Sequence, residues 1–265
     1  MRAPTVRKPP LGARLLGLVG RDRLISLASP LALLLLWEVL AQTGSIDTRF
    51  FPAPSSIFAT MIVLLKSGEL WHHTAVSLQR LALGSLIGGP ALVLGIIMGL
   101  SRPIRALIDP LIAATYPIPK SAILPLALLI FGLGEGSKIF MVAVGVFFPV
   151  AINATAGVLE INKIYLDVGR TFKAGRWNTF RTIALPGALP FIMTGVRLGI
   201  GMGIVLIAVA EMIGAKSGLG YMIWSAWETF AVEQMYVGLF VIAIIGFILT
   251  VTLNEIEKIL IPWRA

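Results

Sequence analysis

The sequence contains no cysteine and few charged residues. The absence of cysteine excludes disulfide bonds, thiolate metal sites and cysteine nucleophiles. Charged residues make up only 13% of the 265 positions, whereas a soluble domain carries about 25%. Hydrophobic residues make up 57%. This balance excludes an ordinary soluble protein and predicts a single polytopic membrane domain.

Catalytic signatures are also missing. The sequence has no G-x-x-x-x-G-K-[ST] phosphate loop, no H-E-x-x-H, no nucleophile elbow and no paired carboxylates within an apolar stretch. The glycine-rich stretch "GLGEGSK" (132–138) has the wrong spacing for a phosphate loop and predicts a tight outer turn. We therefore expect a non-catalytic chain that binds no cofactor itself.

Long apolar runs are what the sequence does have. A membrane-spanning helix needs about 20 mostly apolar residues. Five stretches meet this requirement: 24–43, 81–100, 139–159, 187–213 and 236–253. Residues 102–134 contain five prolines, which break helices, so we expect this stretch to cross once as a broken helix. The prediction is an all-α protein with six transmembrane helices.

The distribution of Lys and Arg predicts the orientation of the spans. Fifteen of the 22 basic residues lie in segments 1–23, 101–105, 160–186 and 258–265, and four lie in segments 44–75, 134–138 and 211–235. Cytoplasmic loops carry the excess of Lys and Arg, which also accounts for the net charge of +9. We therefore expect both termini to be cytoplasmic. The domains are an N-terminal tail (1–23) and a transmembrane domain (24–262), with a cytoplasmic loop over 160–186.

The outer segments contain one predicted helix. Ser55 or Ser56 is a suitable N-cap, and an apolar face follows at helical spacing, formed by Ile57, Met61, Leu64 and Leu65. We expect a short helix along the outer surface. His72 and His73 are predicted to be surface residues, and Glu38 is predicted to be an interfacial or hydrogen-bonded structural residue.

The loop over 160–186 has a pattern of its own. One apolar face recurs at helical spacing in Ile161, Ile164, Tyr165, Val168 and Phe172, and a second in Trp177, Phe180 and Ile183. Pro186 and Pro190 are expected to end regular structure before the next span. The pattern predicts two short helices joined by a basic, aromatic turn. Arg and aromatic side chains are enriched at protein interfaces, so the segment is either a protein interface or a cap on the helix bundle.

This loop resembles the cytoplasmic loop of ABC importer permeases, which reads E-A-A-x-x-x-G-x9-I-x-L-P. Asp167 stands at the glutamate position, and Ile183, Leu185 and Pro186 stand at the closing I-x-L-P. The stretches "FFPAPS", "YPIPKSAILPLALLIFGLGEGSKI", "LPGALPFIMTGVRLG" and "AEMIGAKSGLGYMI" resemble the subgroup that takes up aliphatic sulfonates, taurine, nitrate or bicarbonate. The resemblance extends from about Phe51 to Trp263.

Three positions depart from the motif. Val168 and Gly169 replace its two alanines, and Lys173 replaces its glycine, which in the family forms the bend between two helices. We expect Gly175 to form the bend in place of Lys173, because glycine adopts positive φ angles without strain.

The resemblance implies a type I ABC importer permease in the bacterial inner membrane. Its implied partners are two ATPase subunits that bind ATP and Mg, an external substrate-binding protein, membrane lipid and a second copy of the chain, with no nucleic acid. The residues implied to contact the ATPase are Asp167, Arg170, Thr171, Phe172, Lys173, Ala174, Gly175, Arg176, Trp177, Phe180 and Pro186. The implied cargo is a small anion.

Ionisable residues within apolar stretches are candidates for the transport pathway. These are Lys120, Arg197 and Glu211, for which the alternative is anchoring at the membrane interface or structural hydrogen bonding. Glycines four residues apart predict close helix packing, either inside one bundle or across a two-fold axis. They are Gly84, Gly88, Gly95, Gly99, Gly195, Gly199 and Gly203.

Two other classes of membrane protein compete with the importer. A secondary transporter or channel would work without an ATPase, and such proteins often contain inverted repeats. The sequence shows no convincing internal repeat. A purely structural membrane scaffold would not need the basic cytoplasmic loop.

Overall fold

Every regular element in the computed structural model, which describes residues 28–264, is helical. The α-helices of the described residues are Ala28–Gln42, α2 (Pro54–Lys66), α3 (Glu69–Gly88), α4 (Ala91–Leu100), α5 (Arg102–Thr115), α6 (Leu124–Phe131), α7 (Glu135–Leu159), α8 (Lys163–Thr171), α9 (Arg176–Thr179), α10 (Leu185–Met212), α11 (Leu219–Glu228) and α12 (Val232–Leu260). The 3-10 helices η1 and η3 cover Lys120–Ile123 and Pro262–Arg264, and a π-helical turn, η2, covers Phe180–Ala184. The predicted all-α fold is confirmed for these residues.

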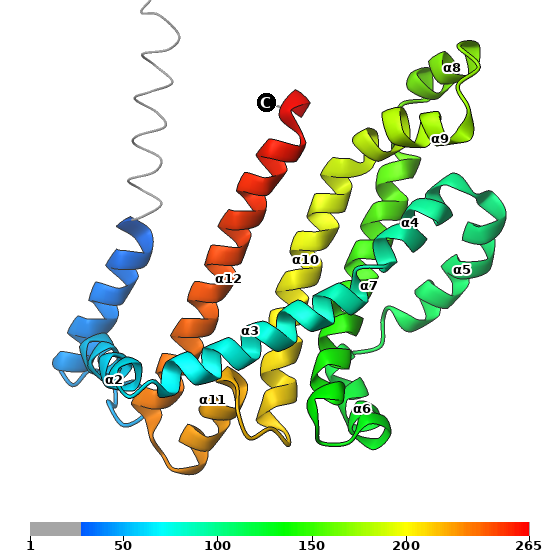
Figure 1. The fold of residues 1–265 in the computed structure, drawn as a ribbon. Coiled ribbons are helices and arrows are strands. Elements are labelled where there is room, and N and C mark those ends of the chain that lie inside the picture. Colours follow the sequence, from blue (N-terminus) through cyan, green and yellow to red (C-terminus); the bar gives the residue numbers. More distant parts are fainter. Residues whose placement is uncertain (1–27, 265) are drawn as a thin grey trace, which may run out of the picture. The chain divides into compact units, whose positions relative to one another are not determined.

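The chain divides between Thr60 and Met61 into two compact units. In the second unit, α8 and α9 lie at the same end of the helices as the last turns of α12, whereas α6 and α11 lie at the other end (Figure 1). We call these the hairpin end and the opposite end. The hairpin is defined as residues 160–184.

Most of the predicted spans are present as long apolar helices. Four stretches are long and apolar enough to cross a membrane: Glu69–Leu100, Glu135–Leu159, Trp177–Met212 and Val232–Leu260. A fifth crossing exists if the bent pair Arg102–Thr115 and Lys120–Phe131 counts as one broken span. The predicted first span is described only from Ala28, as the shorter apolar helix Ala28–Gln42, and the predicted tail, residues 1–23, lies outside the described residues.

The proline-rich stretch is broken at one place rather than throughout. Pro110 lies inside α5, and Pro103 lies in its first turn, where no intrahelical N–H bond is lost. The break falls at residues 116–119, between α5 and η1, where the two helices meet at an angle of 89°. The bent pair agrees with the predicted single broken crossing, and within the described residues Pro110 does not interrupt its helix.

α7 lies at the centre of the second unit because glycines on three helices pack against it. An ideal Cβ on Gly84 of α3 would lie 2.4 Å from the Val142 Cβ, and one on Gly95 of α4 would lie 2.5 Å from the Ala151 carbonyl oxygen. Gly88, Gly99, Gly195, Gly199 and Gly203 likewise face residues of α7. The prediction of close packing is confirmed. These contacts agree with packing inside one bundle, and packing across a two-fold axis stays a prediction.

The hairpin runs without interruption into the next span. The helical stretch Trp177–Met212 contains Pro186 in the first turn of α10 and Pro190 inside it, so the predicted stop at these prolines is wrong. In the π-helical turn before Pro186, the Leu185 N–H donates to the Phe180 carbonyl. This wider register accommodates the proline, which has no N–H of its own.

The predicted outer helix is present as α2, with a different start. It begins at Pro54, so Ser55 lies in the first turn and the predicted serine N-cap is wrong. The Glu38 carboxylate accepts hydrogen bonds from the Ser55 N–H (2.9 Å) and the Ser55 hydroxyl (2.8 Å). Glu38 is therefore a hydrogen-bonded structural residue, as predicted. Ile57 and Leu64 on the predicted apolar face are buried.

Candidate functional site

The hairpin consists of α8, a short turn, and α9 with the π-helical turn. Asn162 is the N-cap of α8. Its side-chain oxygen accepts a hydrogen bond from the Ile164 N–H (3.0 Å). The second part packs on α8 through Gly169, which is buried; an ideal Cβ there would lie 2.9 Å from the Ile183 Cδ1. Gly169, where the family motif has alanine, thus allows the two parts of the hairpin to approach closely.

The bend of the hairpin is at Lys173, not at Gly175. Lys173 has a φ of 51°, whereas the φ of Gly175 is not in the positive range. The Ala174 N–H donates to the Gly169 carbonyl (2.9 Å), which is the hydrogen bond of a Schellman motif with Lys173 at the position that glycine usually occupies. The prediction that Gly175 forms the bend is wrong. The chain keeps the family's bend position and holds a lysine in it, at a cost of about 1–2 kcal/mol.

The predicted apolar face of α8 is exposed. Ile161 is buried, but the other members of the face are not: Ile164 is 65% exposed, Tyr165 62%, Val168 48% and Phe172 81%. Trp177 is 68% exposed and its ring stacks on Phe180, with ring centroids 5.4 Å apart. The face therefore does not cap the bundle of this chain. Exposed apolar patches of this kind mark interaction sites.

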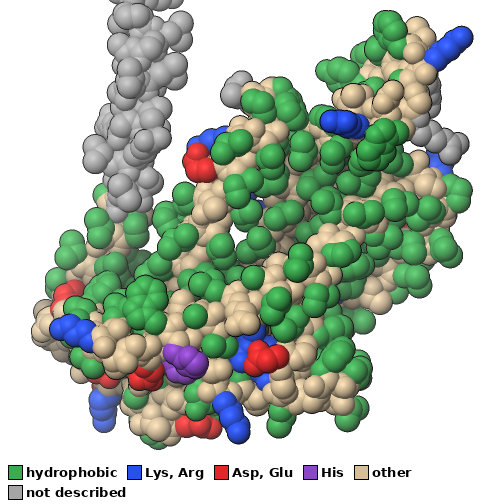
Figure 2. Space-filling view, in the orientation of Figure 1, with side chains coloured by type: hydrophobic (Ala, Val, Ile, Leu, Met, Phe, Trp, Pro, Cys, Tyr) green, Lys and Arg blue, Asp and Glu red, His purple; other side chains and the backbone are tan. Residues whose placement is uncertain are grey.

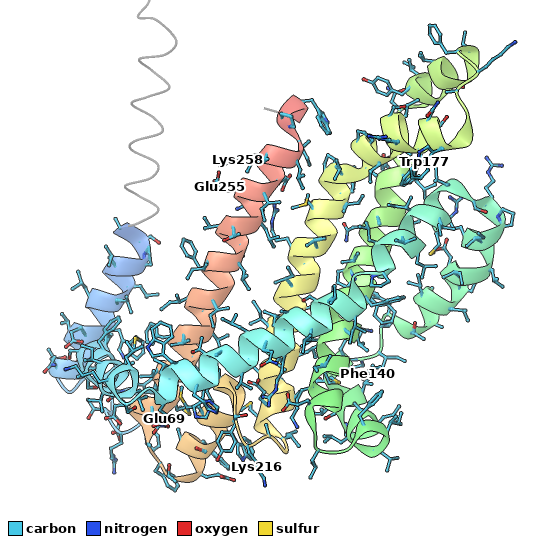
Figure 3. The ribbon with its side chains drawn as sticks, in the orientation of Figure 1. Glu69, Phe140, Trp177, Lys216, Glu255 and Lys258 are labelled. Atoms are coloured by element: carbon cyan, nitrogen blue, oxygen red, sulfur yellow. The ribbon has the colours of Figure 1, made fainter. Side chains whose placement is uncertain are left out.

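Figures 2 and 3 place this surface in the second unit. Hydrophobic side chains cover much of the hairpin (Figure 2). Trp177 lies where α9 approaches the bundle, and Glu69 and Lys216 lie at the opposite end (Figure 3). The hairpin thus presents apolar side chains at one end of the helices.

Lys120 holds the broken pair of helices together. Its ammonium donates to the carbonyls of Thr115 (3.1 Å), Tyr116 (2.7 Å) and Ile118 (3.0 Å). It also lies 4.1 Å from the ring centroid of Phe148 in α7, a cation–π contact. All three ammonium protons are thus directed to the last turn of α5 and the break that follows it. The role of Lys120 in a transport pathway stays a prediction.

Arg197 joins α10 to α12. Its guanidinium forms an ion pair with the Glu257 carboxylate, and both side chains are partly buried. Glu257 lies in the last turn of α12, which is at the hairpin end (Figure 1). This contact does not test the predicted pathway role of Arg197.

Glu211 belongs to a buried polar cluster at the opposite end. Its carboxylate accepts hydrogen bonds from the Arg80 guanidinium (2.8 Å), the Ser77 hydroxyl (2.8 Å) and the Gly220 N–H (3.0 Å), and it is only 1% exposed. Glu211 is therefore a hydrogen-bonded structural residue, which was the alternative to a pathway role. The role of Glu211 in a transport pathway stays a prediction.

Arg80 is the centre of this cluster. It is 3% exposed and forms two 2.6 Å hydrogen bonds with Glu135 of α7, in addition to its bonds with Glu211 and the Ser217 carbonyl. The cluster connects α3, α7, α10 and the loop before α11. The sequence pattern assigned no role to Arg80. A signal was nevertheless present, since a charge beside an apolar run is a candidate functional or structural site.

His73 and Lys138 complete the cluster. His73 is buried, and its Nδ1 accepts a hydrogen bond from the Gly218 N–H (3.0 Å), so its predicted surface position is wrong. His72 is exposed, as predicted. Lys138 is also buried and donates to the carbonyls of Leu133, Gly134 and Gly214. It thereby joins the tight turn predicted at "GLGEGSK", which is present, to the loop after α10.

The same cluster explains why α3 begins earlier than predicted. We placed the start of this span at Leu81, but the helix begins at Glu69. His73, Ser77 and Arg80 are buried in polar contacts, so a polar sequence that suggested a loop forms a packed helix.

Comparisons with known proteins agree with these features. Residues 91–264 match the family described as "Binding-protein-dependent transport system inner membrane component". The chain is 36% identical over 255 residues to the taurine transport system permease protein TauC of Escherichia coli, with 93% of this chain and 92% of TauC covered. It is 33% identical over 266 residues to the putative aliphatic sulfonates transport permease protein SsuC of Bacillus subtilis, with 99% and 93% covered.

A solved structure shows the same fold. The MetNI methionine ABC transporter in inward-facing conformations contains a chain that matches with a TM-score of 0.55 at 21% identity, covering 76% of this chain and 98% of that one. The extent of the sequence matches shows the family. The chain belongs to the binding-protein-dependent transport system inner membrane components, which are the permease subunits of ABC transporters.

Proposed function

We propose that this permease imports a small anion, of the sulfonate, taurine, nitrate or bicarbonate class, across the bacterial inner membrane by alternating access. Two relatives with high coverage are named for taurine and aliphatic sulfonates, which supports this substrate class. In this proposal, both termini are cytoplasmic and the hairpin end faces the cytoplasm. The predicted excess of basic residues in segments at that end supports the orientation.

The proposed assembly contains two copies of the chain, two ATPase subunits that bind ATP and Mg, and an external substrate-binding protein. The observation that carries it is the exposed apolar surface of the hairpin, with Phe172 and Trp177 at 81% and 68% exposure. Aromatic side chains of this kind are enriched at the energetic centres of protein interfaces. The ATPase supplies the nucleotide chemistry, and this chain supplies the docking surface and the pathway.

The connection of the hairpin to α10 gives the docking surface a mechanical consequence. Because the helix runs from Trp177 to Met212, a displacement of α9 moves the span that packs on α7. Gly169 against Ile183 keeps α8 attached to the same segment. Closure of the ATPase pair would therefore reach the membrane helices through a rigid element that has two positions.

Reconstitution tests the proposal. The chain is placed in proteoliposomes with the ATPase and the substrate-binding protein of the same transporter, and uptake of labelled taurine is measured with and without ATP and Mg. We expect uptake only when all components and ATP are present. Uptake driven by an ion gradient in the absence of the ATPase would instead support a secondary transporter or channel.

Crosslinking tests the docking surface separately. A photocrosslinking residue at Phe172 should capture the ATPase subunit, whereas the same residue at Phe247, which is 69% exposed in the middle of α12, should not. Equal capture from both positions would contradict docking at the hairpin.

Lys120, Arg197 and Glu211 remain the proposed ionisable residues of the pathway. Lys120 would have to exchange carbonyl contacts for contacts with the anion, since its three N–H groups are already directed to Thr115, Tyr116 and Ile118. Lys120→Ala should lower anion uptake while leaving association with the ATPase intact. Unchanged uptake would exclude the pathway role.

A further inference from the structure

The turn between α11 and α12 holds a phenylalanine in a strained conformation. Phe230 has a φ of 56°, and within residues 28–264 the only other non-glycine residue with a positive φ is Lys173. The Ala231 N–H donates to the Ala226 carbonyl (2.8 Å), so Phe230 occupies the position of a Schellman motif that glycine usually takes. A bulky residue in this conformation is a genuine outlier.

The ring of Phe230 is not stabilised by packing. It is 84% exposed. Backbone strain and exposure of an aromatic ring both raise the free energy of this turn. Contacts within the described chain offset neither, because so little of the side chain is covered. Residues held in this way are found at binding sites, where a partner supplies the missing contacts.

Aromatic and acidic side chains flank Phe230. The rings of Trp224 and Trp227 are 4.8 Å apart, and the Trp224 Nε1 donates to the Glu228 carboxylate (2.9 Å). On the other side of the turn, Gln234 of α12 donates to Glu69 of α3 (3.1 Å).

Glu228 and Glu233 lie two and three residues from Phe230 in the chain, and Glu69 is hydrogen-bonded to Gln234, four residues after Phe230. Glu69 and Lys216 both lie at the opposite end, away from the hairpin (Figure 3). Residues 219–236, which form α11, the turn and the start of α12, contain two carboxylates and no Lys or Arg, although the whole chain carries a net charge of +9.

We propose that Phe230 is the apolar anchor through which the substrate-binding protein docks, inserting into an apolar pocket bordered by Lys or Arg residues of that protein. This rests on the proposed function, which places the opposite end outside the cell. An aromatic anchor surrounded by charges is a common arrangement at interfaces, where the charges set the association rate. The membrane surface fits less well as the partner, because anionic headgroups repel carboxylates and attract basic residues.

A binding titration tests this proposal. The complete transporter with its ATPase is placed in nanodiscs and titrated with its purified substrate-binding protein. Phe230→Ala should weaken binding by about tenfold to thirtyfold, the loss typical of an aromatic anchor. Phe247→Ala, a matched aromatic on α12, should change the affinity by less than about twofold.

A second variant separates docking from folding. Phe230→Gly relieves the strain at φ 56°, so it should keep or raise the unfolding temperature while weakening binding as much as Phe230→Ala does. The double variant Glu228→Gln, Glu233→Gln should lower the association rate and its dependence on salt. Phe230→Tyr should retain binding.

Two results would overturn the inference: wild-type affinity in Phe230→Gly, or an effect of Phe230→Ala that appears only when the anionic lipid content is varied. Failure of the proposed function looks different. In that case the wild-type transporter itself does not bind the protein.

Discussion

The hairpin end and the opposite end of this permease are stabilised in different ways. At the opposite end, Arg80, Glu211 and Lys138 are buried and hydrogen-bonded to several helices and loops. At the hairpin end, large apolar side chains are exposed and the two parts of the hairpin meet at the close contact between Gly169 and Ile183. The first arrangement fixes loops to the bundle, and the second leaves a surface free for another protein.

Both ends nevertheless contain the same type of turn, a Schellman motif. Lys173 and Phe230 each occupy the glycine position of a Schellman motif, and each is exposed. They differ in chemistry, a cation at the hairpin and an aromatic ring at the opposite end. Neither residue gives the most stable turn, because glycine would be less strained at both positions. This comparison suggests that both side chains are present for contacts outside the chain.

The largest effect is expected where a charge is removed from the buried cluster. Glu211→Gln leaves Arg80 buried with only Glu135, whose side chain is 62% exposed, as its acidic partner. Removing one partner of a buried ion pair costs about 3–5 kcal/mol of unfolding free energy. Thermal unfolding in detergent measures the loss. Glu255→Gln is the control, because its pair with Lys258 is exposed and should contribute little. Equal stability of the two variants would contradict a rigid opposite end.

The next effect concerns the packing on α7 that connects the two ends. An ideal Cβ on Gly199 would lie 3.1 Å from the Val146 carbonyl oxygen, whereas one on Gly201 meets nothing within 4 Å. Gly199→Leu should therefore destabilise the permease by about 1–3 kcal/mol or more through overpacking, and Gly201→Leu on the same helix should not. A stable, fully active Gly199→Leu permease would contradict the close contact of α10 with α7.

At the hairpin end, removal of an exposed ring should affect the partner rather than the fold. Phe172→Ala should weaken binding of the ATPase by about tenfold, as expected for an aromatic residue at an interface. The unfolding temperature should remain unchanged, because the ring is 81% exposed. Pull-down of the ATPase at graded concentrations measures the affinity. A loss of stability without a loss of affinity would show that the hairpin caps the bundle after all.

The smallest effect distinguishes the two candidate positions of the bend, Lys173 and Gly175. Lys173→Gly should stabilise the permease by about 1 kcal/mol, because it relieves the left-handed conformation. Gly175→Ala should be neutral, since Gly175 does not have a positive φ and its Cβ position is open. The opposite ranking in thermal unfolding would place the bend at Gly175. If Lys173→Gly also weakens ATPase binding, the lysine serves the interface at the expense of the turn.

Hydrophobicity and spacing were enough to predict much of this molecule. The apolar runs identified the long helices, and the spacing of Ile164, Tyr165 and Phe172 identified α8. The glycines predicted close packing, because a four-residue period places them on one face of a helix. The period does not name the neighbouring helix, so the choice of α7 had to come from the structure.

The missed features depend on contacts between residues far apart in sequence. His73 bonds to the backbone of Gly218, and Arg80 bonds to Glu135 and Glu211. No local pattern around His73 or Arg80 contains their partners, so a polar stretch of α3 suggested a loop. The bend at Lys173 was missed for a related reason. Preference for glycine favoured Gly175, but the contact of Gly169 with Ile183 and the bond from Ala174 to Gly169 fix the turn two residues earlier.

The length of the helix from Trp177 to Met212 has a mechanical consequence if the helix tilts. Its 36 residues, at about 1.5 Å each, span roughly 54 Å, which exceeds the roughly 30 Å of bilayer hydrocarbon. Gly199, in contact with the backbone of α7, is a natural fulcrum. Trp177 lies roughly 33 Å from it and Met212 roughly 20 Å. A tilt of about 10° would therefore carry Trp177 through about 6 Å and Met212 through about 3 Å in the opposite direction. A short movement at Met212 would thus correspond to a longer one at Trp177, on the surface proposed to dock the ATPase.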